Sequence, residues 1–472
     1  MGSREVTDWQ GKNVTVAGLG VSGLPAAKVL HGLGAKVTVV NDGDDARARE
    51  QAAELEALGV TVRLGDGATL PEGAELVVTA PGWKPDKPLF TAARRAGVPV
   101  WGDVELAWRL RGPDAAPWLC VTGTNGKTTT TRMLASILEA AGLRTAAVGN
   151  IGVSLLDAVL GDERYDVLAV ELSSYQLHWA PSLRAHSAAV LNLAPDHLDW
   201  HGSMEAYARD KGRVYEGNQV ACVYNVADKA TEDLVREADV EEGCRAIGFT
   251  LGAPAPSQLG VVDGILVDRA FVEDRQKNAQ ELAEVSDVDP PAPHNIANAL
   301  AAAALARAFG VPPKAVRDGL RAFTPDAHRI AHVADVDGVA YVDDSKATNT
   351  HAAQASLAAY EKIVWIAGGL AKGATFDELV AGSAERLRGV VLIGADRALI
   401  REALARHAPE VPVVDLGRTD TGAMSAAVQE ARRLAAGGDT VLLAPACASM
   451  DMFVNYNQRG DAFAQAVREL GT

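Results

Sequence analysis

The chain has 472 residues, of which 48% are hydrophobic and 22% are charged. That length exceeds what a single hydrophobic core usually organises, so about three globular domains are expected. The formal net charge of −16 opposes sequence-independent binding to a phosphate backbone, and nucleic acid is therefore excluded as an expected partner. Small anionic substrates remain compatible with this charge, because basic residues can still cluster around one site.

The cysteine pattern and the hydrophobic runs limit the protein class further. Cys120, Cys222, Cys244 and Cys447 are far apart and form no paired metal-ligand spacing, so we expect buried, small apolar residues. No apolar stretch is long enough to span a bilayer, and Met1–Gln10 lacks the basic-then-apolar order of a signal peptide. We therefore expect a cytoplasmic protein without membrane insertion.

The first hundred residues alternate short apolar runs with amphipathic ones, which is typical of a parallel sheet wrapped by helices. In chain order these runs are Val14–Ala17, Leu24–Leu30, Val37–Val40, Ala46–Leu58 and Leu76–Thr79. A second series begins with a strand at Trp118–Val121 and a helix at Thr128–Ala141, followed by strands at Val167–Val170 and Ala188–Leu193. Residues 225–293 are less regular and rich in proline, which predicts loops or a peripheral subsheet.

An alanine-rich helix at Asn295–Phe309 restores clear order, and a third series of elements follows. Its strands are expected near Val339–Val342, Ile363–Ala367, Val390–Ile393 and Thr440–Leu443. The predicted class is α/β with three domains, at residues 1–110, 111–325 and 326–472. We expect a Rossmann-like N-terminal domain, a central P-loop ATPase-like domain with a mostly parallel sheet, and a Rossmann-like C-terminal domain.

A glycine motif follows the first expected strand. Gly18, Gly20 and Gly23 form G-x-G-x-x-G before a helix, which is the context of a dinucleotide-binding turn. NAD is the simplest interpretation. However, the strand end where an acidic residue would bind the ribose begins with Asn41, and a second phosphate loop lies downstream. Because backbone N–H groups at a helix N-terminus bind any diphosphate, the motif predicts a diphosphate-bearing ligand or a purely structural tight turn.

The segment 121–128, V-T-G-T-N-G-K-T, is the strongest single signal. It joins an expected strand to an expected helix, with Lys127 placed to reach terminal phosphates and Thr128 to offer its hydroxyl to Mg²⁺. Val121 stands where the first glycine of the full P-loop pattern belongs, and Gly123 comes two residues later. A loop tighter than the usual P-loop is therefore expected, and it predicts ATP binding.

Polar residues gather after the next two strands. Glu171 falls at the sheet edge where parallel-sheet sites collect, which suits a Mg²⁺ ligand. The segment Asp196–His201 could be a zinc site, but without partner Cys or His motifs it indicates a solvated loop or support for a magnesium site. Lys211, within a helix expected at Met204–Glu216, has on its own the pattern of a surface lysine.

Two polar loops follow strands of the third series, at residues 343–349 and 447–451. The first can bind a small zwitterion by pairing Lys346 with a carboxylate and hydroxyl groups with the remainder. Two such loops at one sheet edge would form a pocket, although each alone is equally typical of a solvated turn.

Together these segments resemble the Mur ligases of bacterial cell-wall synthesis over nearly the whole chain. The loop 123–128 marks the wider family, shared with folylpolyglutamate synthase, whereas 344–349, 445–451 and 457–460 resemble its D-glutamate-adding members. The resemblance implies an ATP-dependent ligase that adds D-glutamate to UDP-N-acetylmuramoyl-L-alanine through an acyl phosphate. It also implies that the three domains bind the UDP-sugar, ATP and the amino acid in turn, and a monomer is expected.

The resemblance also implies roles for individual residues. Lys211 matches a carbamylated lysine that helps to bind two Mg²⁺ ions, and the full set of expected metal ligands is Thr128, Glu171, His197 and Lys211. The catalytic residues implied are Lys127, Glu171, His197, Lys211 and His328. The ATP contacts implied are Gly123, Thr124, Asn125, Gly126, Lys127, Thr128, Thr129, Asn298, Arg329 and Asp344.

The substrate contacts follow from the same resemblance. Asn41 replaces an aspartate expected near uracil, and Tyr456 replaces a phenylalanine. The UDP-sugar contacts implied are Gly20, Val21, Ser22, Asn41, Asn150 and His197. The D-glutamate contacts implied are Lys346, Thr348, Lys372, Ser449 and Tyr456.

Three alternatives remain open. An NAD-dependent dehydrogenase would rest on the motif at 18–23 alone and would leave the loop at 123–128 unexplained. A binding-only relative is disfavoured because Lys127, Glu171, His197 and Lys211 are all present. Another Mur-type or folylpolyglutamate-type ligase would share the phosphate loop, but a folylpolyglutamate synthase would not share the segment 344–349.

Overall fold

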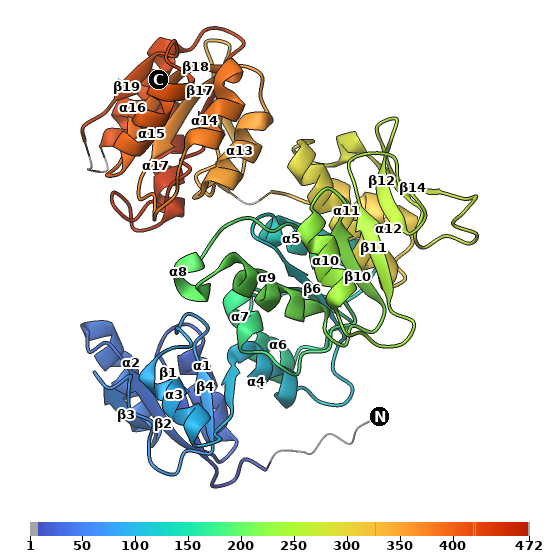
Figure 1. Ribbon diagram of the computed structural model, residues 1–472, viewed down its shortest axis with the longest axis vertical. Coiled ribbons are helices and arrows are strands. Elements are labelled where there is room, and N and C mark those ends of the chain that lie inside the picture. The colour runs from blue at the N-terminus through green and yellow to red at the C-terminus, as the bar shows by residue number, and fades with distance from the viewer. Residues whose placement is uncertain (1–7, 326, 419, 421, 471–472) are drawn as a thin grey trace. The chain divides into compact units, whose positions relative to one another are not determined.

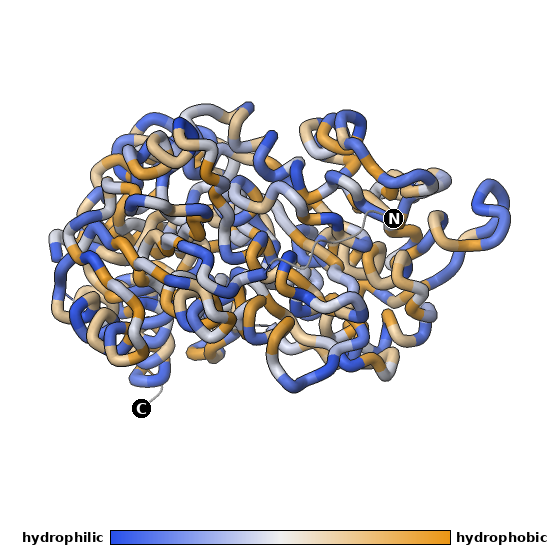
Figure 2. Tube along the Cα trace, turned by 90° about the horizontal axis from the view of Figure 1, so that it is seen from below, coloured by the Kyte–Doolittle hydropathy of each residue, from blue (hydrophilic) through white to orange (hydrophobic). Residues whose placement is uncertain are grey.

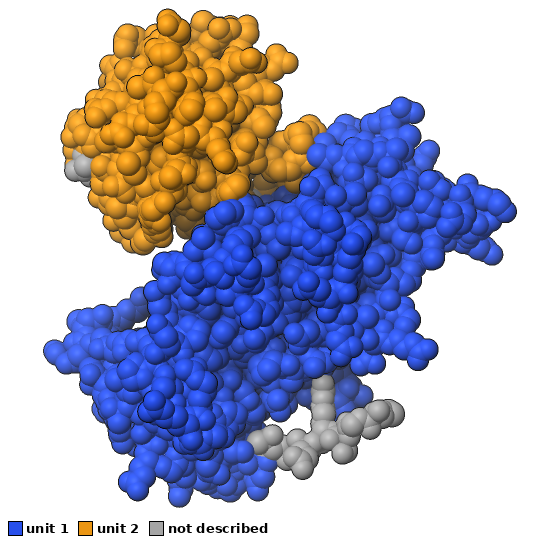
Figure 3. Space-filling view, viewed as in Figure 1, with its two compact units in different colours: residues 1–288, 296–323 blue, residues 289–295, 324–472 orange. Residues whose placement is uncertain are grey.

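The computed structural model describes residues 8–325, 327–418, 420 and 422–470. Most of the Met1–Gln10 segment, and the expected first residue of the third domain at 326, lie outside the described residues. Three sheets of five, nine and six strands, each flanked by helices, confirm the α/β prediction (Figure 1). The chain divides into two compact units, one of 1–288 with 296–323 and one of 289–295 with 324–472 (Figure 3).

The first sheet is parallel throughout, with the order β3-β2-β1-β4-β5. The order reverses next to β1, so the loop that follows β1 lies at the topological switch point where such sheets bind ligands. The strands are β1 (Asn13–Ala17), β2 (Lys36–Asn41), β3 (Thr61–Leu64), β4 (Leu76–Thr79) and β5 (Val100–Gly102); the helices are α1 (Gly23–Gly32), α2 (Ala46–Ala57), α3 (Pro88–Arg95) and α4 (Asp103–Leu110).

The glycine motif after β1 forms a close turn. A Cβ atom at Gly23 would lie 1.8 Å from the carbonyl oxygen of Gly18, so only glycine fits at the start of α1. The Leu19 N–H donates to Asn41 Oδ1 (3.1 Å), which ties the turn to the end of β2. Helix, turn and neighbouring strand therefore fix one another at the switch point.

The second sheet has the order β14-β13-β12-β11-β10-β9-β6-β8-β7. The pairs from β7 to β12 are parallel, and the two pairs from β12 to β14 are antiparallel. The strands are β6 (Trp118–Thr122), β7 (Ala147–Gly149), β8 (Leu168–Glu171), β9 (Ser187–Val190), β10 (Ala221–Asn225), β11 (Arg245–Phe249), β12 (Gln258–Val262), β13 (Ile265–Asp268) and β14 (Gln280–Glu284).

The segment 225–293 extends this sheet rather than forming loops. The expected peripheral subsheet is therefore the better of the two interpretations, because β11 continues the parallel ladder from β10 and three further strands follow at the edge. Its prolines fall mainly between these strands, where no ladder hydrogen bond is lost.

Helices cover both faces of the second sheet. Residues 299–306 of α11 are all fully buried, which explains a helix that is apolar on every side. The helix expected at 204–216 is α-helical only to Gly212 and then tightens into a 3₁₀ turn at Arg213–Tyr215. The helices are α5 (Lys127–Ala140), α6 (Leu155–Leu160), α7 (Ser174–His178), α8 (Leu198–His201), α9 (Met204–Gly212), α10 (Lys229–Glu237), α11 (Pro293–Ala308) and α12 (Pro313–Ala322).

The third sheet has the order β15-β16-β20-β17-β18-β19, parallel except for β15. Alternate residues of β17 enter two separate cores, with Trp365 on one face and Ile366 on the other. The strands are β15 (Ala331–Val336), β16 (Val339–Asp343), β17 (Ile363–Gly368), β18 (Leu387–Ile393), β19 (Val413–Asp415) and β20 (Thr440–Leu443); the helices are α13 (Thr350–Ala358), α14 (Asp377–Ser383), α15 (Arg397–His407), α16 (Ala423–Leu434) and α17 (Tyr456–Leu470).

Hydrophobic and hydrophilic residues are interspersed along the whole trace (Figure 2). This pattern is expected when each sheet and each helix buries one face and exposes the other. None of the described helices combines the length and the apolar composition that a bilayer crossing requires.

We expect Gly23→Ala to destabilise the first sheet by about 1–3 kcal/mol, because the added methyl group must displace the Gly18 carbonyl. A lower urea midpoint of unfolding would measure this cost. Gly20→Ala is the matched control, since a Cβ atom there meets no atom within 4 Å. Equal midpoints for the two variants would contradict the close-turn interpretation.

Candidate active site

The phosphate-loop candidate is a short left-handed turn between β6 and α5. Gly126 adopts φ +84° as the residue preceding α5, and a Cβ atom there would lie 2.4 Å from Asn298 Oδ1. The turn is thus held against α11, beside the N-terminus of α5, where the helix dipole favours an anion. Thr128 is buried in that turn and Thr129 is half-buried.

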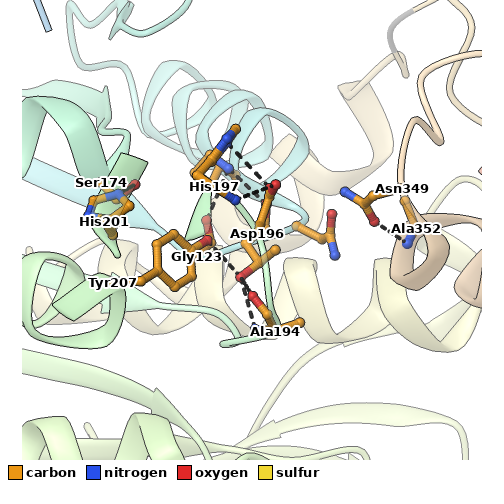
Figure 4. Close-up of polar contacts among 12 residues, drawn as sticks. Gly123, Ser174, Ala194, Asp196, His197, His201, Tyr207, Asn349 and Ala352 are labelled. Carbon is orange, nitrogen blue, oxygen red and sulfur yellow. Dashed lines mark hydrogen bonds and ion pairs between the residues drawn. The ribbon is translucent and has the colours of Figure 1, made fainter. Parts of the chain in front are cut away.

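The segment after β9 clamps this turn from the side. Thr124 N–H donates to the Asn192 carbonyl (3.0 Å), and Asn125 N–H donates to Asn192 Oδ1 (2.8 Å). The Thr124 hydroxyl lies 2.9 Å from the Tyr207 hydroxyl and accepts from Ala194 N–H (3.0 Å). The strand expected to reach residue 193 ends at 190, because Asn192 and Ala194 after it bond to the turn. Ala194 and Tyr207 are labelled in Figure 4.

Two lysines converge on one carbonyl oxygen of the turn. Lys127 Nζ donates to Gly123 O at 3.0 Å, and Lys211 Nζ donates to the same oxygen at 2.7 Å. The Lys211 side chain is buried, so the interpretation of this residue as a surface lysine is wrong. Burial and then the charge of Lys127 lower the pKa of Lys211 well below its usual range, while Asp196 and Glu171 oppose the shift.

A buried carboxylate ends β8. Glu171 is 1% exposed, and its Oε1 accepts from Asn150 Nδ2 at 2.9 Å. Its Oε2 is also buried and has no hydrogen-bond partner among the residues that the structure describes. A buried carboxylate oxygen of this kind is suited to a cation or to a donor from a ligand, so Glu171 fits the expected role in binding a divalent ion.

His197 lies in the loop before α8 in a left-handed conformation (φ +54°). Its Nε2 lies 3.4 Å from Asp196 Oδ2, and its ring packs on Tyr175. Partial burial lowers the pKa of His197, Asp196 opposes this shift, and the charges of Lys127 and Lys211 reinforce it. A neutral imidazole, which can accept a hydrogen bond or bind a metal, is the result.

A histidine–aspartate network supports this region. Asp210 Oδ2 contacts Nδ1 of both His178 (2.8 Å) and His201 (3.0 Å), and His201 Nε2 contacts the Ser174 hydroxyl (2.9 Å). Burial opposes ionisation of Asp210, but the two imidazoles lower its pKa to about 2. Both nitrogens of His201 are occupied, so the zinc interpretation of Asp196–His201 loses one of its ligands. The sequence carried no signal for this network, because His178 lies far from the residues that it meets.

The glycine turn of the first sheet is open on its outer side. Val21 is 86% exposed, and the Ser22 hydroxyl donates to Asp103 Oδ2 (3.0 Å). The Asn41 amide is occupied by the backbone, since its Nδ2 donates to Gly43 O at 2.9 Å while its Oδ1 accepts from the turn. Its present contacts therefore stabilise the turn.

Two hydrogen bonds join the loop after β4 to α8. Trp200 Nε1 donates to Gly82 O at 3.1 Å, and Lys84 Nζ donates to Asp199 O at 2.7 Å. The first and second sheets are connected through these contacts within the same compact unit.

In the second compact unit, polar side chains collect at the end of β16. His328 Nδ1 lies 2.7 Å from Asp343 Oδ2, and this hydrogen bond raises the pKa of His328. Asp344 is buried, and burial raises its pKa to about 6, although the Ser356 hydroxyl and the charge of Arg329 act against the shift. Lys346 lies with its Nζ 5.1 Å from the centre of the Tyr456 ring.

The loops after β16 and β20 are held together by a buried arginine. Arg459 is 1% exposed and donates from Nη2 to Ser345 O (2.8 Å) and from Nη1 to Cys447 O (3.1 Å). Sequence reasoning quoted its motif but gave it no role. Thr348, Lys372 and Ser449 lie in the loops that follow β16, β17 and β20, respectively. Leu370 pairs with Ala448 in an isolated bridge.

Comparison with protein families gives matches along most of the chain. A model of the Mur ligase middle domain matches residues 121–306, and a model of the Mur ligase glutamate ligase domain matches residues 328–447. A model described as pyridine nucleotide-disulphide oxidoreductase matches residues 13–78. That last match covers only the glycine turn and its neighbouring strands, in line with the Rossmann-like topology.

Individual relatives extend this similarity. The chain is 88% identical over 466 residues to a UDP-N-acetylmuramoylalanine–D-glutamate ligase of Streptomyces avermitilis, covering 99% of this chain and 100% of the relative. It is 60% identical to the protein of that name in Thermobifida fusca, covering 98% and 99%. A solved MurF ligase of Thermotoga maritima, in complex with ADP, has the same fold with a TM-score of 0.57, 16% identity and coverage of 99% and 97%.

We expect an NMR titration to show a pKa of His328 above the usual histidine range, because Asp343 accepts a hydrogen bond from its Nδ1–H. Since the folded pKa is raised, this pair stabilises the fold fully below about pH 6.5, and the contribution is lost as pH rises through the folded pKa. Asp343→Asn should lower the His328 pKa, and Asp461→Asn should lower it less. An unchanged pKa in Asp343→Asn would contradict the assignment.

Proposed function

This chain belongs to the Mur ligase family, and we propose that it joins D-glutamate to UDP-N-acetylmuramoyl-L-alanine with ATP as the energy source, in peptidoglycan precursor synthesis. The names of its relatives support this pair of substrates. The observation that carries the chemistry is the convergence of Lys127 and Lys211 on the Gly123 carbonyl, near the base of a helix N-terminus. The Lys127 ammonium beside this helix N-terminus suits the terminal phosphates of a nucleotide.

The ATP contacts are proposed for the turn 123–126 and the first residues of α5. Lys127 is half-buried and can turn from the two loop carbonyls, Gly123 O and Thr124 O, toward a phosphate without moving the helix. Asn298 borders the turn at Gly126 and is proposed on the adenine side. The ADP complex of the related MurF ligase supports a nucleotide in this fold.

Mg²⁺ is proposed at Glu171, with Thr128, His197 and a modified Lys211 as the other protein ligands of two ions. The residues fit because Glu171 Oε2 is a buried oxygen without a partner among the described residues. In the described part of the chain, no group of three acidic, histidine or cysteine side chains is placed so that it could hold a metal ion. That agrees with Mg²⁺, which usually binds one or two carboxylates and completes its shell with phosphate and water. When bound, the ions would neutralise the charge that develops on the transferred phosphoryl group.

Carbamylation of Lys211 is proposed as the source of a further oxygen ligand. A neutral lysine amine adds to the carbon of CO₂ and loses a proton, which gives a carbamate with two oxygens. The lowered pKa of Lys211 supports this step, because more of the amine is neutral at pH 7. The neighbouring Lys127 would offset the negative charge of the product.

The proposed reaction has two steps. A carboxylate oxygen of the alanyl substrate bonds to the terminal phosphorus of ATP while the bond from that phosphorus to ADP breaks. The amine of D-glutamate then bonds to the acyl carbon, loses a proton, and inorganic phosphate leaves. Lys127 and the N-terminus of α5 hold the phosphoryl group, and His328 and Arg329 are assigned to the reacting centre and ATP by their positions in the family pattern.

We propose that the substrates contact the open turn of the first sheet and the loops of the third sheet. The open turn at Gly20, Val21 and Ser22, with Asn41 and Asn150, is proposed for the UDP-sugar. The third-sheet loops with Lys346, Thr348, Lys372, Ser449 and Tyr456 are proposed for D-glutamate, and Asp344 for the ATP ribose. We propose three functional domains, at residues 1–110, 111–325 and 326–472. We also propose that the protein is a monomer that acts in the cytoplasm.

We expect phosphate release from ATP to require both UDP-N-acetylmuramoyl-L-alanine and D-glutamate. A coupled phosphate assay with the purified chain would measure this dependence, with L-glutamate and meso-diaminopimelate as matched amino acids. Equal release with all three amino acids would contradict the proposed specificity.

Lys346→Met should raise the KM for D-glutamate by about tenfold or more, because a carboxylate would lose its charged partner.

We expect Lys211→Ala to lower kcat by about two orders of magnitude, because an oxygen ligand is lost. Added acetate or formate should restore at least part of the activity by supplying that oxygen. Lys127→Ala is the control, since a small anion cannot replace its positive charge. Absence of any recovery in Lys211→Ala would remove the support for a carbamate.

A further inference from the structure

Two cysteines that the sequence separates come together at the base of the second sheet. Cys222 lies in β10, and Cys244 lies in the turn directly before β11. Because β10 and β11 are parallel neighbours, their starting ends meet, and the two sulfur atoms are 3.9 Å apart. The expected burial is confirmed for Cys222, whereas Cys244 is only partly buried.

The two thiols have different surroundings. Cys222 is 2% exposed and accepts a weak hydrogen bond from Asn218 Nδ2 (3.5 Å), whereas Cys244 is partly exposed. The two thiols contact each other, and this contact lowers the pKa of Cys244 and raises that of Cys222. Cys244 is thus the thiol that solvent can reach and that ionises first, which is the pattern of an oxidation-sensitive cysteine beside a resolving one.

The other two cysteines lack these features. Cys120 is fully buried in β6, and burial raises the pKa of its thiol. Cys447 is also buried, and burial raises its pKa to about 12. Both should stay protonated and unreactive at neutral pH, so they serve as internal references.

We propose that Cys222 and Cys244 form a reversible disulfide when the protein meets a peroxide. The Cys244 thiolate attacks one peroxide oxygen, the O–O bond breaks, and a sulfenic acid and hydroxide form. The Cys222 sulfur then attacks the Cys244 sulfur; the S–O bond breaks, and the hydroxyl group leaves with the Cys222 proton as water. A thiol reductant reverses the bond by exchange.

The geometry allows this bond with a local adjustment. The sulfur atoms must approach by about 2 Å to reach disulfide length. Cys244 lies just outside the β11 ladder, in a turn where its N–H donates to Glu241 O (3.0 Å). The bond would close residues 223–243, including α10, into a loop. Closing a loop of this size restricts the unfolded chain, so the oxidised protein should melt at a higher temperature.

The catalytic turn should be affected little. The contacts from this segment toward the turn come from the far end of β10, where Asn225 Nδ2 donates to Leu191 O (3.0 Å) and Asp228 Oδ2 accepts from Leu193 N–H (2.7 Å). Those bonds lie at the opposite end of the strand from Cys222. We therefore expect turnover to remain within about twofold after oxidation, while the melting temperature rises by a few degrees.

The test treats the full chain with hydrogen peroxide under denaturant-free conditions. Intact mass spectrometry should report a loss of two hydrogens, thiol titration should report two fewer free thiols, and digestion should yield a peptide joining Cys222 to Cys244. Dithiothreitol should restore the original mass and the original melting temperature. These readouts do not depend on ligase activity, so they stand apart from the proposed function.

Matched variants separate the roles of the two thiols. In Cys222→Ser, peroxide should convert Cys244 to sulfinic acid, with two oxygens added; in Cys244→Ser, Cys222 should stay reduced. Cys120→Ser should behave like the wild type. The proposal is overturned if wild-type Cys244 gains oxygen without joining Cys222, if all four thiols survive, or if the only disulfide joins two separate chains.

Discussion

The carbonyl oxygen of Gly123 is the point on which the described catalytic framework depends. Two lysine ammonium or amine groups from α5 and α9 meet at this one acceptor, and the backbone there can adopt its path only because glycine occupies the turn. Bringing two potential cations together in a buried place is unfavourable, and the molecule reduces the cost by lowering the pKa of Lys211. Burial is the larger cause of this shift, and the charge of Lys127 is the second.

The elements around this carbonyl hold the turn in one conformation. The residues after β9 leave the sheet early and bond to Thr124 and Asn125, and Tyr207 of α9 completes the clamp. Asp210, on the next turn of the same helix, fixes α9 to α7 and α8 through two imidazoles. The position of Lys211 is therefore determined in part by the contacts of Tyr207 and Asp210, which precede it on the same helix. Preorganised groups of this kind need no rearrangement when charge develops.

Sequence reasoning worked where local pattern decides structure. The fold class is confirmed, and the strands ending at Ala17 and at Glu171 were found because apolar runs followed by polar residues mark parallel strands. It failed where distant residues decide: Lys211 is buried by packing, β9 is shortened by the turn it holds, and the Cys222 contact requires β11 beside β10. The phosphate loop gave a local signal for Lys127 and Thr128, and the strand end gave one for Glu171. The pattern around Lys211 alone favoured the wrong interpretation.

The chain crosses between its two compact units more than once, and this has a practical consequence for dissecting the protein. Residues 289–295 belong with 324–472, although 296–323 belong with the first part of the chain. His294 of this short segment lies near Arg329 of the same unit, and burial together with the charge of Arg329 lowers the pKa of His294 to about 4. Truncation near residue 323 would therefore leave a short stretch without its natural neighbours, and expressing the last 150 or so residues alone would omit a native piece. Fragment studies would need to graft 289–295 onto the carboxyl-terminal portion.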